Sequence, residues 1–212
     1  MTELDAYFFK KNQYMILVIK HESNEGPGTL GDFIKSSGYK VEIAELAKGD
    51  SLPSLSECDW IISLGGPMNV YEEDEYPFLG LEDEFLRGAI EKKVPTLGIC
   101  LGAQMLAKCM KAEVIRSKVK EIGWCQVRLT KDARYDPLFH GLPESLTVFQ
   151  WHEDTFAVPV KSVLLATGSE CQNQAIRIGH HAWAIQFHPE MTPQMIPNWA
   201  KTSTLKSSRS WR

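Results

Sequence analysis

The chain has 212 residues, of which 43% are hydrophobic and 24% charged, and this composition is typical of one soluble globular domain. A formal net charge of -4 argues against a nucleic-acid partner, because proteins that bind nucleic acids usually present a basic face. No apolar run is long enough for a transmembrane helix or a signal peptide. We therefore expect a cytoplasmic protein with no nucleic-acid partner and no membrane association.

In the first half of the chain, short apolar runs rich in strand-forming residues alternate with segments of helical spacing. Strands are predicted at residues 14–20, 41–44, 60–64 and 95–99, and helices at 29–37, 78–93 and 102–110. This alternation indicates an α/β fold with a mostly parallel central sheet flanked by helices.

The second half changes to strand-like runs with little helix between them. They lie at residues 125–130, 146–150, 163–167, 174–178 and 182–187. We interpret these runs as an antiparallel extension of the same sheet, within one domain that covers residues 1–200. Residues 201–212 are rich in Ser, Lys and Arg, and we expect a disordered tail there.

Five cysteines are spread along the chain without a CxxC pair or a Cys/His spacing typical of a metal site. They are Cys58, Cys100, Cys109, Cys125 and Cys171. An odd number of scattered cysteines suits a reducing compartment, where most thiols are buried core groups and a few are catalytic. The adjacent His180 and His181 predict a polar turn, so we expect no metal and no other cofactor.

The segment Gly98-Ile99-Cys100-Leu101-Gly102 lies between a predicted strand and a predicted helix. This is the arrangement of a nucleophile elbow, with Cys where many hydrolases have Ser. The tight turn needs small neighbours, which Gly98 and Gly102 provide, and the start of the helix favours a thiolate and offers the Leu101 N–H to an oxyanion. A buried cysteine at an ordinary strand end is the alternative interpretation of this segment alone.

The segment Gln186-Phe187-His188-Pro189-Glu190 ends the last predicted strand. A thiol nucleophile needs a nearby base, and that base needs an acceptor that orients it. His188 and Glu190 flank a proline that fixes the backbone, so both side chains can face one site. Taken alone, the segment also fits a structural histidine beside a surface glutamate; the two segments together favour a Cys100–His188–Glu190 triad.

Three segments together resemble the class I glutamine amidotransferases, whose fold is flavodoxin-like. They are Leu64-Gly65-Gly66-Pro67, Gly98-Ile99-Cys100-Leu101-Gly102-Ala103-Gln104 and Gln186-Phe187-His188-Pro189-Glu190. The resemblance covers residues 14–199 and is closest to stand-alone members similar to the amidotransferase domain of GMP synthase. Residues 120–124 and 149–154 also resemble that subgroup.

The resemblance implies a role for each residue of the triad. Cys100 would attack the side-chain amide of glutamine, and His188, held by Glu190, would protonate the departing ammonia. Water would then hydrolyse a γ-glutamyl thioester on Cys100 to release glutamate.

The resemblance also implies residues that bind the substrate and the oxyanion. The backbone N–H groups of Gly66 and Leu101 would form the oxyanion hole. Gln104, Gly123 and Trp124 would bind the substrate, with the backbone around Gly123 holding the amino-acid end of glutamine. The alternatives are an ordinary loop at Gly66 and a plain polar helix residue at Gln104. His152 lies beside a position where GMP synthase-like enzymes have a histidine, although the following Glu153-Asp154 departs from their pattern.

Three functional hypotheses remain open at the level of sequence. In the first, the chain supplies ammonia from glutamine to a separate synthetase, such as a GMP synthase-like ATP pyrophosphatase, because no P-loop is found here. In the second, the same triad cleaves another γ-glutamyl compound, such as a γ-glutamyl peptide. In the third, the chain is a non-catalytic binding protein with this fold.

Overall fold

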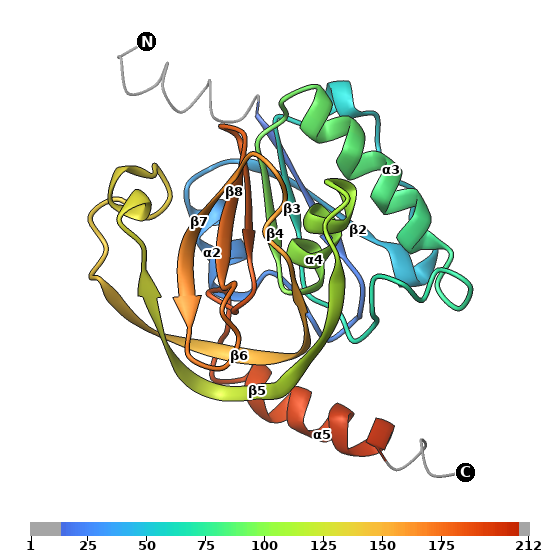
Figure 1. The fold of residues 1–212 in the computed structure, drawn as a ribbon. Coiled ribbons are helices and arrows are strands. Elements are labelled where there is room, and N and C mark those ends of the chain that lie inside the picture. The colour runs from blue at the N-terminus through green and yellow to red at the C-terminus, as the bar shows by residue number, and fades with distance from the viewer. Residues whose placement is uncertain (1–13, 208–212) are drawn as a thin grey trace.

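The computed structural model describes the backbone of residues 14–207 and the side chains of residues 14–201. Its strands form one nine-stranded sheet in the order β2-β1-β3-β4-β9-β8-β7-β5-β6, and the helices lie outside this sheet (Figure 1). The parallel part comprises β1 (Met15–Lys20), β2 (Lys40–Glu45), β3 (Trp60–Ser63), β4 (Thr96–Ile99) and β9 (Ala182–Ile185). The antiparallel part adds β8 (Ala175–Ile178), β7 (Ser162–Gly168), β5 (Val114–Leu129) and β6 (Ser145–Phe156). The predicted α/β fold with an antiparallel extension is therefore confirmed.

Helices cover both faces of the parallel strands. They are α2 (Gly28–Ser36) on one face and α3 (Phe78–Glu91) with α4 (Leu101–Cys109) on the other. Alternating residues of β1 show why: Leu17 and Ile19 pack in the core with α3 and α4, whereas Ile16 and Val18 pack with Ile34 of α2. A strand buried on both faces reads as a continuous apolar run, which made β1 easy to predict.

Two long strands, β5 and β6, curve as one antiparallel ribbon across the end of the molecule where α5 (Met195–Ser207) lies (Figure 1). β5 begins at Val114, eleven residues before the predicted strand, and β6 continues past residue 150 to Phe156. The early part of β5 carries the exposed, charged side chains of Arg116, Lys118 and Lys120, so it lacks the apolar alternation typical of a strand. Its pairing with β6 also shifts register between Arg116 and Glu121.

The helix α5 was not predicted. It extends to Ser207, so the segment expected to be a disordered tail from residue 201 begins inside a helix. Its sequence is polar and contains Pro197, and only Trp199 among its described residues is buried. A single buried side chain leaves almost no helical periodicity to detect. Residues 208–212 of the expected tail, and residues 1–13 of the expected domain, lie outside the described residues.

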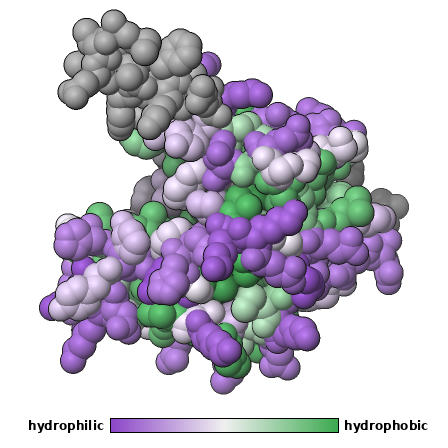
Figure 2. All heavy atoms as spheres, turned by 90° about the horizontal axis from the view of Figure 1, so that it is seen from above, coloured by the Kyte–Doolittle hydropathy of each residue, from purple (hydrophilic) through white to green (hydrophobic). Residues whose placement is uncertain are grey.

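The end of the molecule where β1 begins has a mainly hydrophilic surface with hydrophobic residues near its middle (Figure 2). Within residues 14–207, none of the helices combines the length and the hydropathy that crossing a membrane would require.

Helix α4 packs directly against the end of β3 because glycine allows the two backbones to approach closely. A Cβ atom at Gly102 would overlap the carbonyl oxygen and hydroxyl group of Ser63, and one at Gly98 would overlap the backbone of Gly102 itself. Both glycines of the predicted elbow are therefore required by packing.

We predict that Gly102→Ala destabilises the fold by at least about 1–3 kcal/mol, since overpacking a rigid interior has this cost. Gly80→Ala in α3 is the matched control, because a Cβ atom there meets nothing within 4 Å. Alanine favours a helix over glycine by about 0.8–1 kcal/mol, so the control should be unchanged or more stable. Urea denaturation of both variants measures the difference, and equal stabilities would contradict the packing argument.

Candidate active site

Cys100 forms the whole turn between β4 and α4. Its backbone has φ 51° and ψ -104°, a region that residues other than glycine rarely occupy, and its amide donates to the Ile185 carbonyl of β9 at 2.8 Å. Strain of this kind persists only where the surroundings enforce it, and it is concentrated at functional sites. The sheet thus presents the Cys100 thiol at the N-terminus of α4.

His188 and Glu190 follow β9, the strand that pairs in parallel with β4. Parallel neighbours bring their carboxyl ends to one edge of the sheet, so the two segments predicted from the sequence meet there. The Nδ1 atom of His188 lies 2.8 Å from Oε1 of Glu190, and both side chains are buried. The carbonyl of Glu190 in turn accepts from the Thr29 amide of α2 at 2.9 Å, which fixes this turn to a second element.

The other ring nitrogen of His188, Nε2, has no hydrogen-bond partner among the described residues. Burial lowers the pKa of His188, but electrostatic and polar interactions with Glu190 and with the nearby Cys100 sulfur outweigh burial and hold that pKa well above its ordinary value. The ring can therefore carry a proton beside the sulfur and hold it for transfer.

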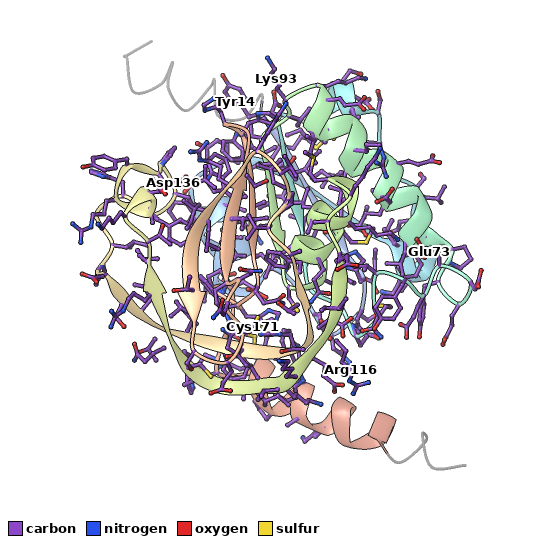
Figure 3. The ribbon with its side chains drawn as sticks, in the orientation of Figure 1. Tyr14, Glu73, Lys93, Arg116, Asp136 and Cys171 are labelled. Atoms are coloured by element: carbon purple, nitrogen blue, oxygen red, sulfur yellow. The ribbon has the colours of Figure 1, made fainter. Side chains whose placement is uncertain are left out.

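A cavity of about 530 Å³ opens in front of these groups. Among the residues that line it are Cys100, His188, Gly66 and Gln104, which the sequence analysis assigned to one site. The wall formed by β5 and β6 contributes further side chains: Arg116, Lys120, Trp151, His152, Glu153 and Asp154. Arg116 lies near the end of the β5 ribbon next to α5 (Figure 3), and it pairs with Glu153 at 2.5 Å.

The predicted oxyanion donors come from two segments, Gly66 from the loop after β3 and Leu101 from the start of α4. A Cβ atom on Gly66 would lie 2.8 Å from Cδ2 of Leu101, so the two residues are in contact. Leu101 is the first residue of α4, and the first N–H groups of a helix have no intrahelical acceptor. Gly65 is adjacent to His188, since a Cβ atom on Gly65 would lie 3.0 Å from Cε1 of His188.

The predicted substrate-binding residues separate into two groups. Gln104 is buried in the cavity wall and donates to the Asp154 carbonyl and to Gln186, each at 3.3 Å. Gly123 and Trp124 instead lie on β5 opposite Gln150 and Phe149, and neither is among the described residues that line the cavity. Trp124 is 64% exposed and packs edge-on against Phe149.

Comparison with known proteins agrees with this geometry. The family model named "Glutamine amidotransferase class-I" matches residues 30–202, which is most of the chain. The chain belongs to this family. The match includes the elbow, the cavity wall and the His188–Glu190 segment, so the resemblance based on short motifs is confirmed.

Individual members of the family are similar over nearly the whole chain. A glutamine amidotransferase from Thermotoga maritima of known structure is 34% identical, with a TM-score of 0.85 over 93% of this chain and 85% of that one. The glutamine amidotransferase-like protein YfeJ of Salmonella typhimurium is 29% identical over 84% of this chain and 76% of its own length. A glutamine-hydrolysing GMP synthase subunit of Thermoplasma volcanium is 30% identical over 84% of this chain and 85% of its own length. Against the GMP synthase of Thermotoga petrophila, at 33% identity, the chain spans 32% of the relative's length.

A second buried histidine, His152, shares the cavity of this amidotransferase but differs from His188 in its partners. Its Nδ1 lies 2.9 Å from the Asp154 carbonyl, and its Nε2 lies 2.9 Å from Oε2 of Glu121. With both ring nitrogens engaged, His152 has no nitrogen available for proton transfer to a substrate. It lies where the sequence placed it, near the site, as part of the wall.

Glu121, His152 and Cys171 are the described residues whose ligand atoms lie within 4.8 Å of one another and could hold a metal ion. Each of them already has hydrogen-bond partners: Glu121 contacts His152 and Gln174, and the sulfur of Cys171 contacts Thr155 at 3.0 Å. Burial also raises the pKa of the Cys171 thiol, which opposes the thiolate that a metal requires. This group is therefore a hydrogen-bonded core rather than a preformed metal site.

Trp199 of α5 is the part of the site that sequence analysis missed. Its ring packs edge-on against His188, with centroids 4.9 Å apart, and against Trp151 at 6.0 Å. It is 6% exposed and lines the cavity. The only signal in the sequence is an aromatic residue in an otherwise polar segment, and this does not indicate what the ring contacts.

We predict a pH-dependent stability difference between the protein and Glu190→Gln. The folded pKa of His188 lies above its unfolded value of about 6.5, so the stability from its charged pairing is fully present below that pH. It is lost as pH rises through the folded pKa. Since a hydrogen bond to a charged group contributes about 1.5–3 kcal/mol, the difference should be of this size at pH 5.5 and smaller at pH 9.

Thermal unfolding across this pH range provides the measurement. Glu84→Gln, which replaces an exposed carboxylate on α3, is the matched control and should show no such trend. A difference between Glu190→Gln and the parent protein that grows with pH would show that His188 is neutral in the folded state.

Proposed function

We propose that this chain is a glutamine amidotransferase that hydrolyses the side-chain amide of glutamine through a γ-glutamyl thioester on Cys100. The proposal depends on one observation: the strained Cys100 turn faces a histidine whose Nδ1 is held by Glu190 and whose Nε2 has no partner among the described residues. A nucleophile, a base and an orienting acceptor in one cavity are what acyl transfer requires.

The proposed reaction has two halves. The Cys100 sulfur attacks the amide carbon, the carbonyl oxygen becomes an oxyanion near the Gly66 and Leu101 N–H groups, and the proton on His188 passes to the amide nitrogen as ammonia leaves. Water then attacks the thioester and gives a proton to His188, and glutamate departs as the sulfur regains its electron pair. Each oxyanion donor typically contributes about 10²–10³ in rate.

Gln104 is the member of the predicted substrate-binding set that we retain, because it is held rigidly in the wall of the cavity. Gly123 and Trp124 are not among the described residues that line the cavity, so this proposal assigns them no contact with glutamine. We propose that the β5–β6 wall beside Arg116 and Lys120 faces the amino-acid end of the substrate instead.

We also propose that the ammonia goes to a separate synthetase. The support is the similarity to the glutamine-hydrolysing GMP synthase subunit of Thermoplasma volcanium, which is matched over 85% of its length. The nature of the acceptor follows only by analogy with that relative.

The size of the cavity favours a second candidate substrate. A volume of about 530 Å³ is in the range that holds drug-sized ligands and exceeds the needs of one amino acid. A γ-glutamyl peptide could place its γ-glutamyl group at Cys100 and its remaining residues along the wall.

We predict that Cys100→Ala lowers glutamate release from glutamine by more than about 10³-fold, because the nucleophile of a triad cannot be replaced by its neighbours. Cys58→Ala is the matched control. Cys58 is also buried, but burial raises the pKa of its thiol to about 11 and it lies outside the cavity lining. The control should retain activity.

Steady-state assays of both variants with glutamine and with a panel of γ-glutamyl peptides provide the test. Faster turnover of glutamine supports the amidotransferase, whereas much faster turnover of peptides would make the chain a γ-glutamyl hydrolase. Activity that survives in Cys100→Ala would refute both.

A further inference from the structure

His21, which follows β1, is a fully buried histidine that lies outside the proposed triad. Its Nδ1 lies 3.0 Å from the carbonyl oxygen of Gly65, and its Nε2 lies 2.6 Å from Oε2 of Glu82 in α3. The second carboxylate oxygen of Glu82 accepts from the Ser63 hydroxyl at 2.6 Å. The Gly65 carbonyl can only accept, so Nδ1 of His21 donates to it, and where Glu82 is ionised Nε2 donates as well and the ring is an imidazolium.

The surroundings of His21 are consistent with this charge. Burial alone lowers the pKa of His21, but the negative charge and hydrogen bond of Glu82 and the hydrogen bond to Gly65 raise it above its ordinary value, with a smaller contribution from Glu25. The ring of Phe78 is stacked with the His21 ring, with the two centroids 6.3 Å apart.

The bond from His21 determines how one peptide group is turned. The Gly65 carbonyl and the Gly66 N–H belong to the same peptide, and there is no cis peptide among the described residues. In a planar trans peptide these two groups point in opposite directions. The carbonyl points to His21, so the N–H points away from it, on the side where Gly66 lines the cavity with Cys100.

The Gly66 amide is also free to act there, since it donates no hydrogen bond to the described part of the chain. Its position leaves little room for change: a Cβ atom at Gly66 would lie 2.8 Å from Cβ of His21 and 2.8 Å from Cδ2 of Leu101. A fixed peptide with an unused donor is what stabilisation of a developing oxyanion needs.

We propose that His21, held by Glu82, is a positioning residue that locks the Gly65–Gly66 peptide with its N–H directed at the substrate oxyanion. This inference rests on the proposed function for its catalytic consequence. The positive ring lies behind the peptide and polarises it, so His21 acts on the transition state through a backbone group without touching the substrate.

Two substitutions of similar shape separate the donor from the bulk of the side chain. His21→Asn keeps a donor, because the amide nitrogen of Asn can replace Nδ1, whereas His21→Leu has none. We expect His21→Leu to lower kcat for glutamate release by about 10²–10³-fold with KM changed less than about threefold, and His21→Asn to stay within about tenfold of the parent. Should His21→Leu fail to fold, Glu82→Gln tests the same lock and should lower kcat about tenfold, since it removes only the charge.

A second readout isolates the oxyanion hole from the nucleophile. Alkylation of Cys100 by iodoacetamide forms no oxyanion, so its rate, followed by mass spectrometry, should be unchanged in His21→Leu. Asp136→Asn is the matched control for a damaged buried network, because Asp136 is 1% exposed and accepts from Arg177 and Trp183. It lies on the far side of the molecule from Arg116, which lines the cavity (Figure 3). It should lose stability but keep kcat.

The proposal is overturned if His21→Leu keeps the parent kcat, if Cys100 alkylation slows as much as turnover, or if Asp136→Asn loses kcat equally. If the parent protein releases no glutamate from glutamine or any γ-glutamyl peptide, the proposed function fails, and crystal structures of the two His21 variants then decide the inference. A Gly65 carbonyl turned in His21→Leu but not in His21→Asn supports the lock. An unchanged peptide in both refutes it.

Discussion

Between Ile99 and Leu101 the chain passes from strand to helix in one residue, and Cys100 takes the whole change of direction at φ 51°. This turn exists only because α4 can approach the sheet closely, which requires the absence of side chains at Gly98 and Gly102. It also requires β9 beside β4, since the Ile185 carbonyl accepts the Cys100 amide. The strained backbone of Cys100 is therefore held in place by three elements, β4, β9 and α4, which are themselves packed in the core.

The same sheet order brings His188, the proposed base, into place. His188 follows β9 and so emerges beside Cys100, while its own amide donates to the Phe149 carbonyl of β6 at 2.9 Å. The antiparallel extension thus does more than lengthen the sheet, because β6 anchors the histidine turn and supplies the cavity wall. α5 then covers the same histidine through Trp199. Parts of the chain with little apolar pattern are those that enclose the site.

This division explains what the sequence could and could not predict. The elbow, the His188–Glu190 segment and the buried parallel strands depend on local rules: small residues at a tight turn, a proline that fixes the backbone, and apolar runs. These rules are visible in a single sequence. The first half of β5 pairs with β6, and α5 contacts the site through Trp199, so both depend on residues distant in sequence, and their exposed side chains in the described part of the chain carry no period that reveals them.

Gly123 and Trp124, which the resemblance assigned to substrate binding, do not line the cavity, and the register of β5 bears on their place. Their assignment came from resemblance to a short motif, but the side of β5 that faces the cavity is set by register. β5 shifts register between Arg116 and Glu121, and a slip of one residue exchanges the two faces of a strand. The number of residues in such an irregularity cannot be read from a motif. Trp124 is 64% exposed and does not line the cavity, whereas Arg116 and Lys120 do.

Three buried histidine–glutamate pairs surround the site, and they show how the fold assigns different roles to the same chemistry. His21 pairs with Glu82, His152 with Glu121, and His188 with Glu190. Burying an ion pair has a desolvation cost, and removing one partner from a buried pair typically costs about 3–5 kcal/mol. Because the fold carries this cost three times near one cavity, we expect each pair to have its own structural or catalytic role. In His21 and His152 the second ring nitrogen is tied to a backbone carbonyl, so these rings fix the peptide or strand that they contact.

Only the His188 ring, among these three, has a nitrogen without a hydrogen-bond partner in the described part of the chain. A ring with both nitrogens occupied cannot accept or deliver a proton at a substrate, whereas a ring held at one nitrogen can do so at the other. In the proposed mechanism, a single backbone carbonyl on the second ring nitrogen therefore distinguishes His21 and His152 from His188, the proposed base.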